Sequence, residues 1–170
     1  MLYKLLGILG IIIADQAIKT YLIWLLARDV VLVAPGLELI PQPVLFARAN
    51  EFFNLIFTWN PGTSFSMLTS VGETAPWAIA VLTAAIIGFL THRLFVGRVG
   101  RIEDTALVLI IGGALGNLID RIRFGAVVDF LDFHWGVWHW PAFNFADIFI
   151  CLGIAVYFYG LIKRDWYGKK

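Results

Sequence analysis

The sequence predicts an all-α membrane protein in which four transmembrane helices carry a small β-rich cap outside the cytoplasm. Of the 170 residues, 60% are hydrophobic and only 15% are charged, which is more apolar surface than a soluble domain of this size could bury. The apolar residues gather into four blocks of roughly membrane-spanning length. Between these blocks lie short β-branched and aromatic runs broken by Pro and Gly, a pattern typical of strands and turns.

Each block is long enough to cross a bilayer as a helix, because about 1.5 Å per residue gives about 27 to 33 Å against a bilayer core of about 30 Å. Asp15 and Lys19 interrupt the first block and no small-residue cleavage site follows it. We therefore expect a retained helix and not a cleaved signal peptide. The chain is predicted to be one integral-membrane domain, residues 1–170, with spans at 5–26, 75–94, 105–122 and 142–162.

Basic residues mark one end of the predicted bundle. They precede the first span, fill the connection between the second and third, and follow the last, whereas those at the other end are mixed with acidic residues. The positive-inside rule places both termini in the cytoplasm. Residues 27–74 and 123–141 then face outward. Because the basic residues are dispersed, we expect no nucleic-acid partner, and the single Cys151 excludes an intramolecular disulfide.

The outward segments have different compositions. In the first, 30–40 and 52–59 are predicted to be strands. The second carries Trp135, Trp138 and Trp140, whose rings suit the headgroup layer of a membrane.

Several polar residues stand in or next to the predicted spans, where charge is costly. Asp15 and Lys19 are four residues apart on one helical face and could pair, either as structural support or in a functional role. In the third span, Gly112 and Gly116 form a small-residue pair that permits close helix packing. Three polar side chains follow on this span, and we expect them to have a supporting structural role: Asn117, Asp120 and Arg121.

Two aspartates suggest chemistry. Asp129 follows the third span on an apolar segment, and Asp147 lies near the start of the fourth, about 9 Å below its outer end and on the same face as Asn144. If the two carboxylates meet, both cannot ionise cheaply and they share a proton, as in an aspartic protease. A proton-coupled transporter using Asp15, Asp120 and Asp147, a non-catalytic assembly factor and a purely structural polar network stay open at this point.

Other polar residues have simpler interpretations. Asn60, Pro61 and Gly62 are first of all a turn signal. Asp132, close to the tryptophans, is expected to be a solvated or interfacial charge. A zinc site formed with His134 and His139 is not favoured in so aromatic a run.

The motifs and their order resemble those of lipoprotein signal peptidase, or signal peptidase II. The matching stretches are ADQAIK (14–19), WNPGTSFS (59–66), GGALGNLIDR (112–121), VVDF (127–130) and FNFAD (143–147). They fall on all four predicted spans and both outward segments, so the resemblance covers essentially the whole chain. The stretch 37–50 looks longer than usual in that family, as if the cap carried an insertion.

The resemblance implies an aspartic endopeptidase of a bacterial cytoplasmic (inner) membrane. Such an enzyme removes the signal peptide from prolipoproteins, on the amino side of a diacylglyceryl-modified cysteine, at the outer face. It implies no cofactor and no metal, with lipidated prolipoprotein and membrane lipid as partners. Carried over by motif, Asp129 and Asp147 are the catalytic pair. The residues implied to orient the substrate or support this pair are Asp15, Asn60, Gly62, Asn117, Asp120, Arg121, Asn144 and Ala146.

Overall fold

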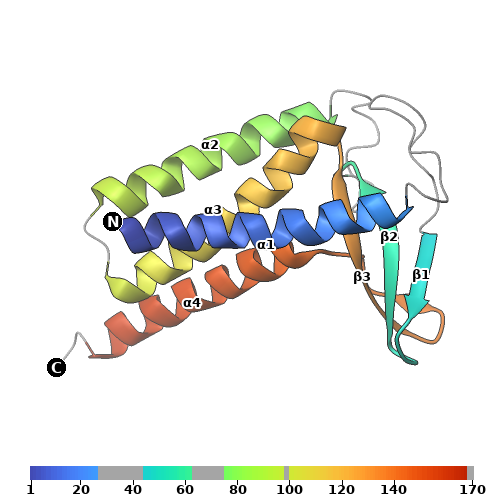
Figure 1. Ribbon diagram of the computed structural model, residues 1–170. Helices are drawn as coiled ribbons and strands as arrows, with labels where there is room; N and C mark the ends of the chain where they lie inside the picture. The colour runs from blue at the N-terminus through green and yellow to red at the C-terminus, as the bar shows by residue number, and fades with distance from the viewer. Residues whose placement is uncertain (27–43, 63–74, 98–99, 168–170) are drawn as a thin grey trace.

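The computed structural model describes residues 1–26, 44–62, 75–97 and 100–167. Its helices are α1 (Leu2–Leu26), α2 (Ala75–Val96), α3 (Arg101–Phe124) and α4 (Phe145–Tyr167), and its strands are β1 (Val44–Arg48), β2 (Phe53–Asn60), β3 (Val127–Trp135) and β4 (Trp138–His139). The helices form an elongated bundle with both termini at one end and the strands at the other (Figure 1). Within the described residues, four helices are long and apolar enough to cross a membrane, which confirms the predicted fold class.

Helix α3 is the centre of the bundle, because it packs against α1, α2 and α4. Its glycines make this possible. A Cβ at Gly112 would lie 2.9 Å from Ile11 of α1, and one at Gly113 would meet the carbonyl oxygen of Ala146 in α4. A Cβ at Gly116 would lie 2.6 Å from Oδ2 of Asp15. The close packing predicted for this glycine run is therefore confirmed, and it involves two neighbouring helices.

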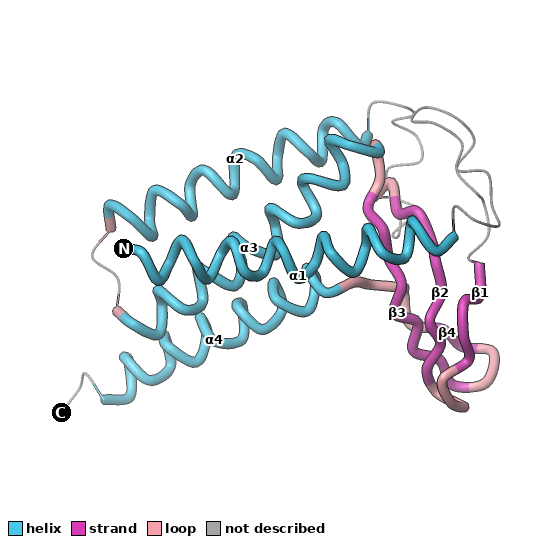
Figure 2. The backbone as a smooth tube through the Cα atoms, viewed as in Figure 1, coloured by secondary structure: helices cyan, strands magenta, loops and turns pink. Residues whose placement is uncertain are grey.

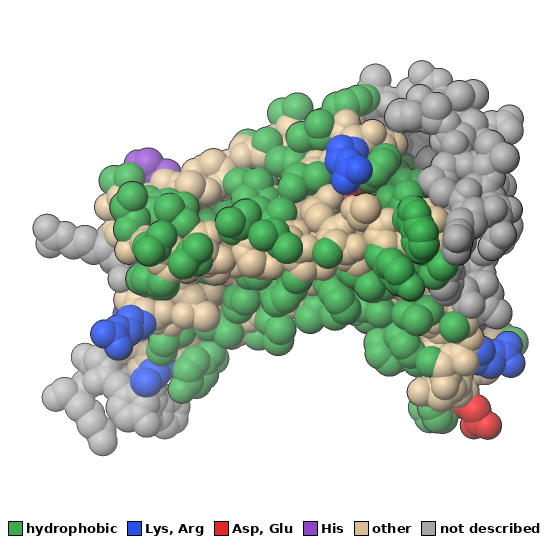
Figure 3. All heavy atoms as spheres, viewed as in Figure 1, with side chains coloured by type: hydrophobic (Ala, Val, Ile, Leu, Met, Phe, Trp, Pro, Cys, Tyr) green, Lys and Arg blue, Asp and Glu red, His purple; other side chains and the backbone are tan. Residues whose placement is uncertain are grey.

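The outer faces of the helices are apolar, as Figure 3 shows for one side of the molecule. Large side chains such as Leu9, Val81, Phe89 and Phe158 are more than half exposed. A soluble protein seldom exposes so continuous an apolar surface, whereas a bilayer solvates it.

The strands form an antiparallel sheet in the order β1-β2-β3-β4, across the end of the bundle (Figure 2). Strand β2 confirms the strand expected at 52–59, whereas the one expected at 30–40 lies outside the described residues. Residues 37–43 of the suspected insertion also lie outside them, and 44–48 form β1. Thr58 pairs with Asp129 and Asn54 with Asp132, and one extra residue of β2 forms a bulge between these pairs.

The second outward segment contains strands that the sequence analysis did not predict. Helix α3 ends at Phe124 and is capped by Gly125, whose φ of 71° lies in the left-handed region that favours glycine. The chain then turns into β3, which pairs with both β2 and β4. Strands β3 and β4 form a hairpin, in which Trp135 pairs with Trp138, and these two side chains are 78% and 59% exposed. The expected aromatic surface is therefore carried by a β-hairpin.

Candidate functional site

A cleft of about 720 Å³ is lined by the sheet, by Pro61 after β2 and by the segment that precedes α4. Its floor follows one side of β2, since alternate residues of a strand face the same way. Asp129 is the member of the predicted pair that lines it. The residues around the cleft are Arg48, Asn54, Ile56, Thr58, Trp59, Asn60, Pro61, Asp129, Asp132, His139, Trp140, Pro141 and Ala142.

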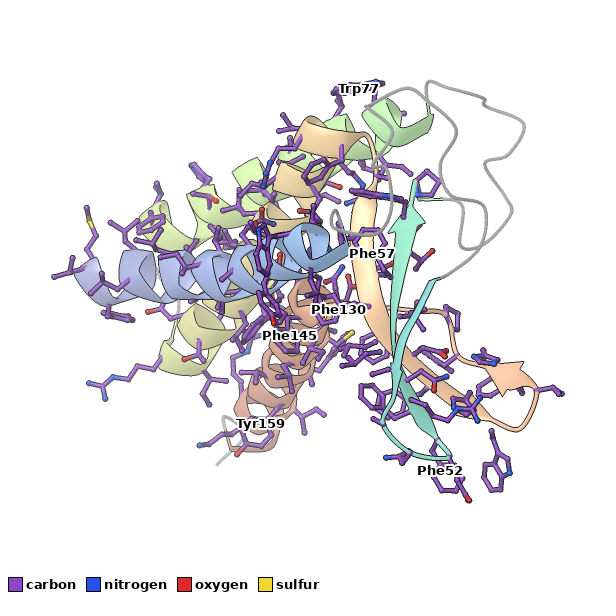
Figure 4. The ribbon with its side chains drawn as sticks, turned by 45° about the vertical axis from the view of Figure 1, so that its right-hand side comes forward. Phe52, Phe57, Trp77, Phe130, Phe145 and Tyr159 are labelled. Carbon is purple, nitrogen blue, oxygen red and sulfur yellow. The ribbon has the colours of Figure 1, made fainter. Side chains whose placement is uncertain are left out.

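Asp129 and Asp147 are brought together by Asn144. The side-chain Nδ2 of Asn144 donates to Oδ1 of Asp129 over 2.7 Å, and its backbone N–H donates to Oδ2 of Asp147 over 3.0 Å. Packing beside them holds β3 on the start of α4. The rings of Phe130 and Phe145 meet edge to face with centroids 5.4 Å apart (Figure 4). The two carboxylates therefore share one donor residue, at the point where β3 packs on the start of α4.

Asp147 lies in the first turn of α4. The sequence analysis placed it deeper, about 9 Å into the helix, because it expected the helix to begin at residue 142. The first helical residue is Phe145, and Asn144 precedes it as the N-cap. A helix N-terminus is a position where negative charge is favoured, because unpaired N–H groups and the helix dipole point at it. Asn117 of α3 adds a third contact by donating from Nδ2 to Oδ1 of Asp147 over 2.8 Å.

Asp129 is almost fully buried, with 2% of its surface exposed. Burial, and then the negative charge of Asp147, raise its pKa from the ordinary 3.8 to about 7. Hydrogen bonds from Asn144 and Asn60 act in the opposite direction but do not cancel these two effects. Near neutral pH this carboxyl therefore holds a proton in a large fraction of molecules.

A buried lysine lies behind this pair. Lys19 is 2% exposed, and its Nζ lies 2.9 Å from Asp15 and 2.8 Å from Asp120. The same ammonium donates to Oδ1 of Asn117 over 3.0 Å. Because Oδ1 of this amide is occupied, its NH₂ is directed at Asp147. The pairing expected between Asp15 and Lys19 is confirmed, but sequence reasoning did not include Lys19 among the site residues. Its position four residues after an aspartate was the available signal.

Asp120 and Arg121 are neighbours in the sequence but contact different residues. Asp120 accepts hydrogen bonds from Gln16 and from the backbone of Val128, besides its contact with Lys19. Arg121 donates to the carbonyl oxygen of Asn117 over 3.3 Å, and its buried Nε has no partner among the described residues. Successive residues of a helix face different ways, so neighbours in the sequence need not contact one another.

Asn60 and Gly62 form the expected turn, and Asn60 also contacts Asp129. Oδ1 of Asn60 accepts from the backbone N–H of Gly62 over 2.8 Å, and Gly62 has a φ of 94°. The other side of the amide, Nδ2, donates to Oδ2 of Asp129 over 2.9 Å. The turn expected from Asn-Pro-Gly thus fixes the direction of a donor toward Asp129.

Ala146 is completely buried between helices. Its backbone N–H donates to Oδ1 of Asp15 over 3.0 Å, so α1 helps to cap α4. A side chain larger than a methyl group would meet α3 near Gly116. The eight predicted supporting residues therefore lie in one region around Asp129 and Asp147. Asp15 and Asp120 contact Lys19, which donates to Asn117, and Asn117 in turn donates to Asp147.

The expectation that Asp132 is a solvated charge is wrong. Asp132 is 4% exposed, and it accepts from Nδ2 of Asn54 over 2.9 Å and contacts Nδ1 of His139 at 2.8 Å. Its pairing with a polar residue of β2 could not be seen without the strand register. In the described part of the chain, no group of three His, Cys, Asp or Glu side chains is arranged to hold a metal ion.

The chain is similar to known proteins over most of its length. A family model described as signal peptidase (SPase) II matches residues 7–163. The lipoprotein signal peptidase of Aeromonas hydrophila is 45% identical over 145 residues, which cover 85% of this chain and 78% of that protein. The lipoprotein signal peptidase of Polynucleobacter necessarius is 42% identical over 130 residues, 76% of each chain. A solved structure titled as a bacterial membrane enzyme has a TM-score of 0.69 at 24% identity, covering 100% of this chain and 93% of that one.

Proposed function

Because this chain belongs to the signal peptidase II family, we propose that it is an intramembrane aspartic endopeptidase acting on bacterial prolipoproteins. Its reaction is removal of the signal peptide, by cleavage on the amino side of a cysteine that carries diacylglyceryl. Asp129 and Asp147 form the catalytic pair of this proposal.

The bridge formed by Asn144 is the observation that supports these roles most strongly. One residue donates to both carboxylates, at 2.7 Å and 3.0 Å, and one of these carboxylates, Asp129, lines the cleft. Purely structural aspartates would be expected to have cationic partners, as Asp15 and Asp120 have in Lys19. Instead, the neighbours of Asp129 and Asp147 are neutral amides that orient the carboxylates without neutralising them.

The chemistry follows from one proton shared by two carboxylates. With its pKa raised to about 7, Asp129 is the carboxyl that holds the proton, and Asp147 is the base. Asp147 takes a proton from water as the oxygen attacks the scissile carbonyl carbon, and Asp129 donates its proton to the carbonyl oxygen. Collapse of the tetrahedral intermediate breaks the C–N bond and passes a proton to the leaving amine, which is the new N-terminus of the lipidated cysteine.

The position of the pair suits a lipidated substrate. Asp147 lies in the first turn of a membrane-spanning helix, and Asp129 lies on the strand across that end of the bundle. A signal helix in the bilayer with its lipid in the same leaflet presents the bond between them at this boundary. We infer that both termini are cytoplasmic and that the sheet lies on the outer side of a bacterial inner membrane. A reporter fused after the last residue should be active only in the cytoplasm; activity only outside it would contradict this orientation.

Cleavage by the purified protein tests the proposal. A lipidated prolipoprotein should be converted to the shorter product by wild type and not by Asp129→Asn or Asp147→Asn, measured by mass spectrometry of both products. Glu51→Gln is the matched control, because Glu51 is exposed and is not part of the cleft. It should retain wild-type turnover. Full activity of a folded Asp129→Asn enzyme would contradict the proposed catalytic pair.

A further inference from the structure

The end of the cleft farthest from Asp147 holds a second polar group that the proposed reaction does not use. It consists of Arg48, Asn54, Asp132 and His139, which come from β1, β2, β3 and β4. Asn54 and Asp132 are 7% and 4% exposed. Buried polar side chains are expensive unless they are paired, and this group is paired only in part.

The unpaired atoms are the informative ones. Asn54 donates from Nδ2 to Asp132, but its buried Oδ1 has no hydrogen-bond partner among the described residues. Because a carboxylate only accepts, Asp132 fixes His139 with its proton on Nδ1 and leaves Nε2 available. The Asn54 amide oxygen therefore lacks a donor, and the imidazole of His139 can take part in one more hydrogen bond.

The strand register gives the distance of this group from the catalytic pair. Asp129 lies opposite Thr58, and Asp132 lies opposite Asn54, four residues earlier on β2. Because the bulge adds one residue to β2, the separation is counted on β3, where three residues at about 3.4 Å each give about 10 Å. An extended peptide covers that length with about three residues.

We propose that Arg48, Asn54, Asp132 and His139 form a subsite for the polypeptide that follows the lipidated cysteine, about three residues beyond the scissile bond. This inference rests on the proposed peptidase function. Oδ1 of Asn54 and Nε2 of His139 each accept a main-chain N–H, and the Arg48 guanidinium donates to a main-chain carbonyl oxygen. Asp132 is a positioning residue that orients the side chains of Asn54 and His139. Main-chain recognition of this kind does not depend on which side chains follow the cysteine.

The test compares two lipidated peptides that share one signal sequence and end either one or six residues after the cysteine. For wild type, kcat/KM should be about tenfold higher for the longer peptide, the effect of one or two hydrogen bonds in a buried site. In Asn54→Ala and His139→Phe, the ratio of the two kcat/KM values should fall toward one. The second variant keeps a ring next to His134, which stacks on His139 with centroids 5.0 Å apart. A merely structural defect lowers both values and leaves their ratio unchanged.

The outcomes separate this inference from the function on which it rests. Failure of wild type to cleave either peptide would contradict the peptidase function itself. Equal kcat/KM for the two lengths, or a wild-type ratio in both variants, would overturn the subsite alone. If kcat/KM of the variants instead depended on the acyl groups of the substrate and not on its length, the four residues would bind lipid, which would also overturn the proposal. Asn50→Ala, in the exposed turn between β1 and β2, should keep the wild-type ratio.

Discussion

Asn144 and Asp147 cap the start of α4 for one another. Oδ1 of Asn144 accepts from the backbone N–H of Asp147 over 3.1 Å, while Oδ2 of Asp147 accepts from the backbone N–H of Asn144 over 3.0 Å. This reciprocal arrangement is a capping box, which satisfies N–H groups that a helix start otherwise leaves unpaired. It also leaves Nδ2 of Asn144 directed at Asp129. The same two residues thus begin the helix and align the proposed catalytic pair.

The buried charges behind the pair lead to a prediction about stability. Asp120→Asn should lower the free energy of unfolding by about 3 kcal/mol, because a buried ammonium loses one of its two carboxylates. The double variant Lys19→Met with Asp120→Leu should be less destabilised than the sum of its single variants, since the Lys19–Asp120 contact is lost only once, although Asp15 still loses its ammonium partner. Thermal unfolding in detergent measures both effects. An Asp120→Asn protein with wild-type stability but no turnover would instead give Asp120 a direct part in catalysis.

The glycines of α3 give a prediction about packing. Gly116→Ala should destabilise the protein and reduce turnover, because the new methyl group would lie 2.6 Å from Oδ2 of Asp15 and displace the carboxylate that holds Lys19 and caps α4. Gly10→Ala is the control, because nothing lies within 4 Å of a Cβ at this position of α1. It should be neutral or slightly stabilising. Equal effects of the two substitutions would show that helix propensity and not close packing decides the outcome.

The raised pKa of Asp129 gives a prediction about stability and pH. The folded protein keeps this proton up to about pH 7, whereas the unfolded chain releases it near the ordinary pKa of 3.8. Between these values the folded state binds more protons, so the contribution of Asp129 to stability falls as the pH rises through this window, by up to about 4 kcal/mol. Asp129→Asn removes that fall. Relative to wild type, the melting temperature of the variant should therefore be higher at about pH 8 than at about pH 5. A difference independent of pH would contradict the raised pKa.

The sequence was a good guide where long-range structure was not needed. Four apolar blocks were enough for the helices, because length and hydrophobicity decide whether a segment spans a bilayer. The positions of Asp129 and Asp147 came from motif spacing and from the cost of charge in an apolar chain. Their approach to one another is consistent with that reasoning, through Asn144.

Features that depend on strand register could not be read in the same way. Asp132 looked incidental because its partners, Asn54 and His139, are 78 and 7 residues away and meet it only once the sheet has formed. The strand β3 reads as an apolar run that is buried along most of its length, which periodicity does not separate from other buried segments. Lys19 was seen as a partner of Asp15, but its contact with Asn117 requires the packing of α1 on α3.

The pH dependence of cleavage tests the shared proton most directly. The measurement is kcat/KM of wild type on a lipidated peptide in detergent, across the range in which the protein stays folded. Two coupled carboxylates that work with one proton between them predict a bell-shaped profile whose limbs belong to the pair. The pKa of Asp129 is raised to about 7, so the alkaline limb should lie near this value, where the pair loses its shared proton. A flat profile from acid to alkaline pH would contradict catalysis by Asp129 and Asp147.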